Sequence, residues 1–287
     1  MTSFEAIRYW GMPMLKEETF TGRGGTRIFM RSWRPPAPKG VVVICHGVNS
    51  HSGQYLWTGE QLAAAGFAVY AYDHRGRGKS EGPRFYIDDI SDYTEDLGTL
   101  INLAKSREPG LKVFLLGHSA GGVVGCTWAL DHQQEIAGFI CESFAYKVPA
   151  PAPVLALVRL FGKIAPRLPV LKLHMKDFTR DPAALATLEV DPLCKGEIQP
   201  ARTVAALLKA TDRMKAEFGT LKLPLLIMHG TNDKATVPAG SKEFYEAAGS
   251  SDKTLKLYQD HYHDLLNDFG KDKVMTDIVL WVNTHLA

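Results

Sequence analysis

The sequence G-H-S-A-G at residues 117–121 places a serine where a catalytic nucleophile could stand. An apolar run precedes it at residues 113–116, and a helix-like stretch follows at residues 120–131. In this strand–turn–helix context the turn exposes the serine hydroxyl, and the flanking glycines relieve crowding around the bend. The N-terminus of the helix also stabilises nearby negative charge. We therefore predict that Ser119 is a nucleophile rather than a structural turn serine.

A serine hydroxyl needs a general base, and the base needs a carboxylate to orient it. Asp233 follows the apolar run at residues 223–228, and His263 follows the run at residues 254–258. Each would leave the C-terminal end of a strand, where active-site groups of such sheets lie. The chain order serine, aspartate, histidine also occurs in known triads of this kind. These features predict a triad of Ser119, Asp233 and His263.

Alternatives are open at the base and acid positions. His261 also follows the last strand, but His263 is preferred because an aromatic residue precedes it and a helix-like pair of leucines follows. Asp260 and Asp264 are too near the histidine in sequence to reach it from a separate loop. The alternative role for Asp233 is that of a turn-capping residue.

The loop after the apolar run at residues 40–45 is a candidate oxyanion site. The backbone N–H groups of such a loop, with the one that follows the nucleophile, stabilise the developing charge. The predicted donors are the N–H groups of Val48 and Ala120, and His46 and His51 are expected to orient the loop. The chain has no HExxH motif and no Cys/His spacing typical of metal sites, so we predict no metal and no cofactor.

The composition of the 287 residues is that of a soluble globular protein. Hydrophobic residues account for 45% and charged residues for 22%, which excludes disordered, collagenous and disulfide-rich classes. The 33 basic and 31 acidic residues give a net charge of +2. So small a charge does not attract nucleic acid or an anionic membrane, and neither is expected as a partner.

The N-terminus and the cysteines predict a cytoplasmic protein. Residues 1–20 lack the basic-then-apolar order of a signal peptide. The uncharged stretch at residues 113–130 contains several glycines, which favours a strand, a turn and a helix over a membrane span. The four cysteines form no CxxC pair and are expected to be small buried hydrophobic residues.

Short apolar runs alternate with helix-like segments along most of the chain. Their unbroken hydrophobicity indicates strands buried on both faces, and hence a mainly parallel sheet. The predicted strands are 40–45, 67–72, 113–116, 136–141, 223–228 and 254–258, and the predicted crossover helices are 54–65, 88–105 and 120–131. The glycine-containing stretch at residues 16–33 predicts an antiparallel hairpin. Together they predict a doubly wound α/β fold.

This alternation breaks in one segment, residues 144–214. Prolines recur there, no convincing strand is present, and residues 154–164 and 202–214 look helical. We predict a helical cap inserted into a core formed by residues 1–143 and 215–287. The helix at residues 154–164 is apolar nearly all round, so it packs against the core, lines an apolar pocket or contacts lipid.

A basic loop at residues 73–80 ends in the Gly-Lys-Ser of a phosphate-binding loop. The motif requires a glycine where Asp73 stands, so phosphate binding is not predicted. The loop carries three cations, Arg75, Arg77 and Lys79. We expect them to pair locally rather than to bind nucleic acid, and the nearby carboxylates are Asp73, Glu81 and Asp88.

Taken together, these motifs resemble the α/β-hydrolase superfamily, and within it the monoacylglycerol lipase and lysophospholipase-like serine hydrolases (serine aminopeptidase-type hydrolase domain). The segments that carry the resemblance are 25–29, 46–47 with 51–53, 73–80, 114–122, 225–233, 253–256 and 262–263. The resemblance implies a mainly parallel eight-stranded sheet with helices on both faces and a helical cap over an acyl channel. It also implies the triad of Ser119, Asp233 and His263, with Val48 and Ala120 as oxyanion donors.

Departures from this family concern the alcohol side of the substrate. Animal monoacylglycerol lipases tend to carry Glu before the loop histidine and Arg just beyond it, where this chain has Ser50 and Gln54. Leu266 and Leu188 stand where the family has a polar histidine and a cap tyrosine. Most of the glycerol-binding set is therefore missing, which favours a broader ester hydrolase. The cap candidates for substrate binding are Leu155, Val158 and Leu188.

The sequence thus predicts an enzyme, a serine carboxylesterase or lipase that hydrolyses small to medium apolar acyl esters through an acyl-enzyme. A small-molecule ester is the predicted partner. Lysophospholipase, thioesterase and aminopeptidase activities on the same scaffold are the enzymatic alternatives. The non-enzymatic alternative is a hydrolase-fold ligand-binding protein, which is disfavoured because such proteins usually lack a triad member and none is missing here.

Overall fold

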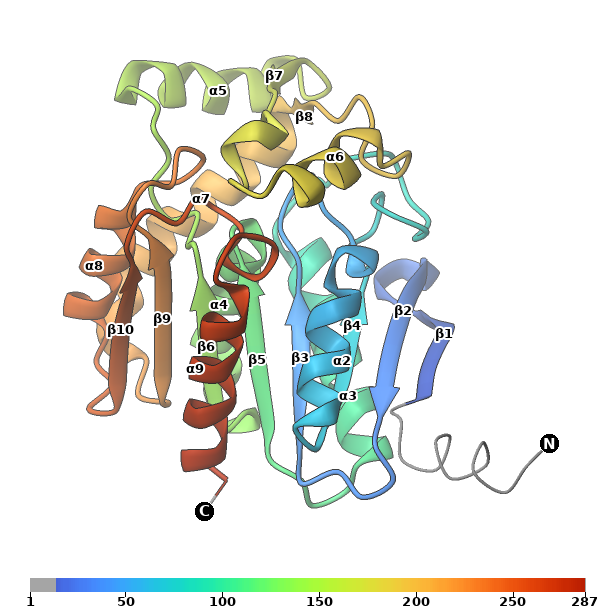
Figure 1. The fold of residues 1–287 in the computed structure, drawn as a ribbon. Coiled ribbons are helices and arrows are strands. Elements are labelled where there is room, and N and C mark those ends of the chain that lie inside the picture. The colour runs from blue at the N-terminus through green and yellow to red at the C-terminus, as the bar shows by residue number, and fades with distance from the viewer. Residues whose placement is uncertain (1–13, 287) are drawn as a thin grey trace.

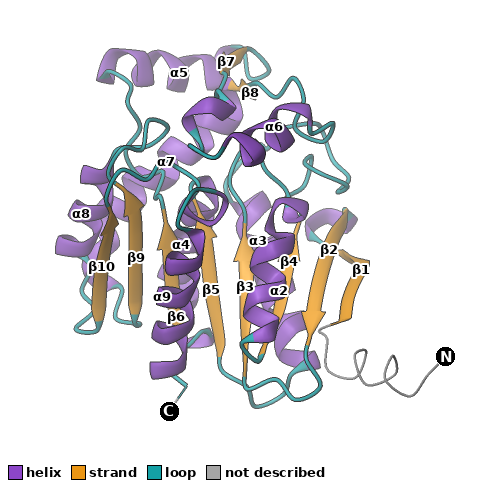
Figure 2. Cartoon of the chain, viewed as in Figure 1, coloured by secondary structure: helices purple, strands orange, loops and turns teal. Residues whose placement is uncertain are grey.

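The computed structural model describes residues 14–286. Residues 1–13, which make up most of the segment used above to argue against a signal peptide, lie outside the described residues. The described chain forms one large sheet with helices on both faces (Figure 1). Further elements lie beyond the C-terminal ends of the parallel strands (Figure 2).

The main sheet has eight strands in the order β1-β2-β4-β3-β5-β6-β9-β10, so the predicted mainly parallel eight-stranded sheet is confirmed. The β1–β2 hairpin and the β2–β4 pair are antiparallel, and the other pairs are parallel. The strands are β1 Met14–Thr21, β2 Arg27–Arg34, β3 Gly40–Cys45, β4 Phe67–Tyr72, β5 Val113–His118, β6 Gly138–Glu142, β9 Leu225–Gly230 and β10 Lys253–Tyr258.

Helices cover both faces of this sheet, which explains the unbroken apolar runs of its central strands. Helices α2 and α9 pack on one face, and α3, α4 and α8 pack on the other (Figures 1 and 2). Their bounds are α2 Leu56–Ala64, α3 Ser91–Arg107, α4 Ala120–His132, α8 Pro238–Ala247 and α9 Lys271–Thr284. Short 3₁₀ helices occur at Arg23–Gly25, Ser52–Tyr55, Gln133–Glu135, Met175–Asp177, Phe218–Thr220 and Leu265–Asn267. Between residues 14 and 286, the helices include none long and apolar enough to cross a membrane.

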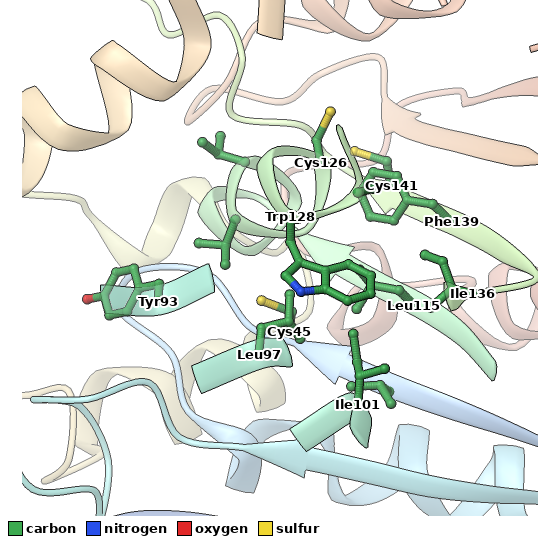
Figure 3. Packing of buried hydrophobic residues seen from close by; sticks show 14 of the residues in the cluster. Cys45, Tyr93, Leu97, Ile101, Leu115, Cys126, Trp128, Ile136, Phe139 and Cys141 are labelled. Carbon is green, nitrogen blue, oxygen red and sulfur yellow. The ribbon is translucent and has the colours of Figure 1, made fainter. Parts of the chain in front are cut away.

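Trp128 of α4 anchors the core between the sheet and α3. Its indole is buried and lies among Leu115, Ile136 and Ile101 (Figure 3). Gly98 of α3 permits this packing, because a Cβ there would lie 2.9 Å from the indole nitrogen. The tight contact fixes α4, whose N-terminus carries the predicted nucleophile.

The predicted core strands agree with the observed ones to within two residues at each end. Strands β5 and β9 run two residues beyond their apolar runs, into His118 and Gly230 respectively. They do so because the backbone pairing with β6 and β10 continues after hydrophobicity ends. The hydrophobic pattern alone therefore does not predict the last residues of these strands, which lie nearest the candidate site.

The inserted segment contains α5 Ala152–Ile164, α6 Pro182–Val190 and most of α7 Ala201–Glu217, which continues three residues beyond the predicted end of the segment; α6 was not predicted. The prediction that it lacks strands is wrong. Two short strands, β7 Pro169–Leu171 and β8 Gln199–Pro200, form an antiparallel ribbon. Both contain proline and are too short for any periodicity, which explains why the sequence conceals them. Helix α7 packs on both α5 and α4, and so joins the inserted segment to the core.

Leu116 of β5 tests whether the sheet core carries the stability of the fold. Its side chain is fully buried in the cluster between the sheet, α2 and α9. We expect Leu116→Ala to lower the free energy of unfolding by about 2–5 kcal/mol in denaturant titrations, because it leaves a cavity. The matched control is Leu280→Ala at an exposed position of α9, where the change should stay within about 0.5 kcal/mol. Equal effects of the two substitutions would contradict this account.

Candidate active site

Ser119 occupies a sharp turn between β5 and α4. Its backbone is left-handed, with φ +55° and ψ −118°, a conformation that costs a non-glycine residue about 1–3 kcal/mol. Close packing holds the turn, since a Cβ on Gly121 would lie 2.0 Å from the carbonyl oxygen of Cys45. The Ser119 N–H donates to the Glu142 carbonyl at 2.9 Å. The strand–turn–helix context predicted for Ser119 is therefore present.

Asp233 and His263 meet at the ends of β9 and β10. His263 Nδ1 donates to Asp233 Oδ2 at 2.7 Å, and both side chains are fully buried. Because the carboxylate accepts a hydrogen bond from the Nδ1–H group, the proton stays on Nδ1 and the lone pair of the neutral ring lies on Nε2, as a general base requires. Within residues 14–286, Nε2 has no hydrogen-bond partner, Ser119 Oγ included.

Asp233 is held by more groups than the sequence indicated. Its Oδ1 accepts the N–H groups of Ala235 and Thr236 at 2.8 and 2.9 Å, and its Oδ2 accepts the Thr236 hydroxyl at 2.7 Å. His229 Nε2 lies 3.0 Å from the same Oδ2. Burial alone would raise the pKa of Asp233, but His263 and His229 outweigh it and hold that pKa below its usual range. The carboxylate is thus charged and fixed in orientation.

The alternative acids and base lie elsewhere. His261 Nδ1 bonds the carbonyl of Gln259 at 3.0 Å. Asp260 lies on the surface beside Asn232, with a left-handed φ of +63°. Asp264 is buried on the other side of the histidine loop, where its Oδ2 accepts from Asn267 at 2.9 Å. Of these residues, only His263 contacts Asp233.

The predicted oxyanion donors face one cavity. Val48 and Ala120 line it together with Ser119, and neither backbone N–H donates a hydrogen bond within the described chain. Gly47 brings the two segments together, since a Cβ there would lie 2.9 Å from the Cβ of Ser119. Val48 and Ala120, the first residue of α4, therefore line the space beside the predicted nucleophile, an arrangement that suits a developing negative charge.

His46 and His51 have hydrogen bonds that orient this loop. His46 Nε2 accepts the His74 N–H at 2.9 Å, and His46 Nδ1 donates to the Gly47 carbonyl at 2.6 Å. His51 Nδ1 accepts the Gly53 N–H at 3.0 Å, and its Nε2 donates to Asp191 of the inserted segment at 2.7 Å. The loop is thus fixed from both the core and the insertion.

The prediction that the three cations of residues 73–80 pair locally is wrong. Arg75 binds Asp96 of α3 at 2.7 Å, Lys79 binds Glu17 of β1 at 3.1 Å, and Arg77 binds Glu197 of the inserted segment. The loop folds between these three elements, so its partners come from distant parts of the sequence. Asp73 instead accepts the N–H of Ser52 at 2.7 Å and that of Lys79 at 2.7 Å.

The cavity beside Ser119 has a volume of about 310 Å³, at the small end for ligand sites. Its walls are mostly apolar and come from the core and from the inserted segment. Leu155 and Val158 of α5 line it, as do Phe178 and Leu207, whereas Leu188 is buried in α6 and is not among the lining residues. The polar lining residues other than Ser119 are Lys172, His174, Asp177, Gln199, Thr211, Lys234 and Thr236.

Two groups of side chains bring possible metal ligands within 4.8 Å of one another: His51, Asp191 and Cys194, and His118, Glu142 and Asp264. In the first, His51 is hydrogen-bonded to Asp191, and burial raises the pKa of the Cys194 thiol, which disfavours the thiolate that binds metal.

The second group lies beside the loop that carries His263. Glu142 Oε1 accepts the Leu265 N–H at 2.9 Å, and His118 Nδ1 lies 3.0 Å from the Tyr55 hydroxyl. Burial, followed by the neighbouring His263, lowers the pKa of His118 to about 3, so the His118 ring is neutral. Burial and Asp264 raise the pKa of Glu142 well above its usual range. Hydrogen bonds therefore account for His51 and Asp191 of the first group, whereas in the second group His118 Nε2, Glu142 Oε2 and Asp264 Oδ1 are buried without a hydrogen-bond partner among residues 14–286.

Comparison with known proteins gives the family. Residues 36–269 match the family described as "Serine aminopeptidase, S33", which is most of the chain. The chain belongs to this family of α/β-hydrolases. The superfamily predicted from the sequence is therefore confirmed.

Relatives of this hydrolase act on esters. It is 35% identical to a monoacylglycerol lipase of Mycolicibacterium smegmatis, over 94% of this chain and 98% of that protein. The crystal structure of the Paleococcus ferrophilus monoacylglycerol lipase has a TM-score of 0.81 and 31% identity, covering 90% of this chain and 99% of that one. A soluble variant of the Saccharomyces cerevisiae monoglyceride lipase, in complex with a substrate analogue, has a TM-score of 0.84 and 25% identity over 95% of each chain. This hydrolase is an enzyme that hydrolyses esters.

The raised pKa of Glu142 predicts how the free energy of unfolding of this hydrolase depends on pH. A carboxyl whose pKa is raised on folding costs stability once the pH exceeds its unfolded value of about 4.3, and the cost grows toward the folded pKa. Glu142→Gln keeps an acceptor for the Leu265 N–H and removes this titration. We expect the free energy of unfolding of the variant, relative to wild type, to rise between pH 5 and pH 8 in urea titrations.

The matched control is Glu60→Gln, at an exposed position of α2 where water hydrates the carboxylate in both states. Its difference from wild type should be the same at both pH values. A difference for Glu142→Gln that does not change with pH would contradict the raised pKa.

Proposed function

We propose that Ser119, Asp233 and His263 are the catalytic triad of this hydrolase. The observation that carries the proposal is the 2.7 Å hydrogen bond between two buried side chains, Asp233 and His263, at the strand edge that also bears the Ser119 turn. The bond directs the free Nε2 away from the carboxylate. The positive φ of Ser119 supports the same conclusion, since strain of this kind is typical of active sites.

In the proposed mechanism, Ser119 Oγ attacks the ester carbonyl carbon while His263 Nε2 takes its proton. The carbonyl oxygen becomes an oxyanion and accepts the N–H groups of Val48 and Ala120. The tetrahedral intermediate then expels the alcohol, which takes the proton from Nε2, and leaves an acyl-enzyme. Water activated by Nε2 breaks the acyl bond in the same way and restores Ser119. Asp233 stabilises the imidazolium in both halves.

We propose that residues 144–214 act as a lid that recognises the acyl chain. Support comes from α5, whose Leu155 and Val158 contribute to an apolar cavity that also contains Ser119. A volume of about 310 Å³ favours small to medium acyl groups. Monoacylglycerols are the first candidates, because relatives at 35% and 31% identity are monoacylglycerol lipases. Ser50, Gln54 and Leu266, which depart from the glycerol-binding set, favour a broader range of alcohols.

A lysophospholipase is the second candidate. It is favoured by three residues of the cavity wall that are or can be cationic, Lys172, His174 and Lys234. These side chains could attract a phosphate on the leaving alcohol. A higher kcat/KM for a monoacylglycerol phosphate than for the matching monoacylglycerol would favour this candidate.

We also propose a cytoplasmic location. The support is that all four cysteines are free and buried, which suits a compartment where thiols stay reduced.

Ser119→Ala tests the triad. We expect kcat for p-nitrophenyl esters to fall roughly 10⁴- to 10⁶-fold, because the nucleophile is lost, while the circular dichroism spectrum stays unchanged. A fluorophosphonate probe should label the wild-type protein at Ser119 and leave the variant unlabelled. Near-normal ester hydrolysis by a folded Ser119→Ala protein would sink the assignment. Failure of the folded wild type to react would instead favour a ligand-binding protein.

Leu155 and Leu157 offer a matched test of the lid, because they lie two residues apart on α5. Leu155 lines the cavity, whereas Leu157 is 49% exposed and outside it. We expect Leu155→Trp to lower kcat/KM for a decanoyl ester at least about tenfold relative to an acetyl ester, because the larger ring shortens the acyl site. Leu157→Trp should leave this ratio unchanged. A parallel response of the two variants would exclude α5 as the wall of the acyl site.

A further inference from the structure

Glu197 lies in the inserted segment between α6 and β8, yet its carboxylate reaches the proposed oxyanion loop of the core. Its Oε1 accepts the backbone N–H of Asn49 at 2.8 Å, across 148 positions of sequence. Asn49 directly follows Val48, whose N–H is a proposed oxyanion donor. Asn49 has a left-handed φ of +54°, a conformation that asparagine tolerates better than most residues. The contact therefore holds the loop at a residue with a left-handed backbone conformation.

The Glu197 carboxylate is fixed in turn by Arg77. The two form an ion pair in which each side chain is only 1% exposed. The Arg77 guanidinium also donates to the Tyr93 hydroxyl at 3.1 Å and to Gln199 Oε1 at 2.7 Å. Gln199 returns a hydrogen bond to Glu197 Oε1 at 2.5 Å. A buried carboxylate with several donors on one oxygen has little freedom, so it can fix the group that it binds.

A second connection joins the same loop to the same segment. His51 Nε2 donates to Asp191 Oδ2 at 2.7 Å, and Gln54 Nε2 donates to the same oxygen at 3.2 Å. The loop at residues 46–54 is thus held by two carboxylates of the inserted segment. Of these two, only Glu197 binds the backbone next to Val48.

We propose that Glu197 is a positioning residue for the oxyanion site. Its carboxylate fixes the Asn49 N–H and thereby directs the preceding Val48 N–H toward the carbonyl of the substrate. Because Glu197 belongs to the lid, docking of this part of the lid on the core and alignment of the oxyanion site are one event. The inference rests on the proposed function, in which Val48 stabilises the oxyanion.

Two variants of Glu197 distinguish the effect of its acceptor oxygen from the effect of its side-chain volume. Glu197→Ala removes the acceptor, and we expect kcat for an acetyl ester to fall about 10- to 100-fold with KM changed less than about threefold. Glu197→Gln keeps an oxygen that can accept the Asn49 N–H, and kcat should stay within about threefold of wild type. An alkyl boronic acid, which forms a tetrahedral adduct with an active serine, should lose affinity for Glu197→Ala by the same factor as kcat.

Glu197→Ala leaves the buried Arg77 unpaired, so it can lose activity through misfolding. A second pair of variants distinguishes misfolding from loss of the acceptor. The double variants Arg77→Met with Glu197→Leu and Arg77→Met with Glu197→Gln both lack the ion pair, and only the second retains the acceptor. The first should show the loss of kcat and the second should not. Asp212→Asn, which breaks the exposed ion pair with Arg159 within the lid, is the control and should leave kcat and KM unchanged.

Equal kcat in the variants with and without the acceptor would overturn the proposal. So would a rise in KM at constant kcat, since the contact would then serve substrate binding. Fluorophosphonate labelling distinguishes failure of the proposed function from failure of the positioning role. If wild-type Ser119 is not labelled, the proposed function itself fails. If it is labelled and Glu197→Ala hydrolyses esters normally, only the positioning role fails.

Discussion

The parallel pairing of the central strands is the constraint on which the site depends. Its register places Cys45 opposite Gly117, His118 opposite Glu142, and Gly230 opposite Tyr258. The strands therefore end together, and the loops that follow them begin along one edge of the sheet. Ser119 is the first residue after β5, Val48 and Asp233 are the third residues after β3 and β9, and His263 is the fifth after β10, so all four proposed site residues follow strand ends on this edge. A slip of one residue in any pair would turn a functional side chain to the wrong face.

Residues near this edge show how far local sequence signals reach. The Ser119 turn could be predicted because its glycines and its flanking segments are all within ten residues. Asp233 and His263 could be predicted because each follows an apolar run, and the order of the runs is that of the strands. The sheet could be predicted for the same reason, since burial on both faces leaves a continuous hydrophobic signature.

The polar contacts that hold the candidate site residues in place could not be predicted in the same way. Arg77 and Glu197 are 120 positions apart, and nothing in either neighbourhood marks the other as its partner. Glu142 is the last residue of the apolar strand β6, but its hydrogen bond to the Leu265 N–H depends on how β6 packs against a segment more than 120 positions away. The strands β7 and β8 were missed for a different reason, since strands of two and three residues are too short to show a hydrophobic periodicity. Long-range polar contacts and very short elements are thus the features that required coordinates.

The inserted segment combines two kinds of contact with the core, and they differ in how freely they can change. Helix α5 contributes apolar side chains to the cavity wall, where a substitution of similar polarity alters volume and shape but leaves every hydrogen bond intact. Residues 191–199 contribute the buried carboxylate of Glu197, the buried amide of Gln199 and the partly buried carboxylate of Asp191. Losing one partner there leaves the other without its hydrogen bond in a low-dielectric environment. If the proposed function holds, substrate preference can therefore vary through Leu155 and Val158 while the connection through Glu197 is kept. On this argument, the α5 wall is where a substitution changes the acyl specificity of this hydrolase, and the Arg77–Glu197 pair is where a substitution disturbs the proposed oxyanion loop.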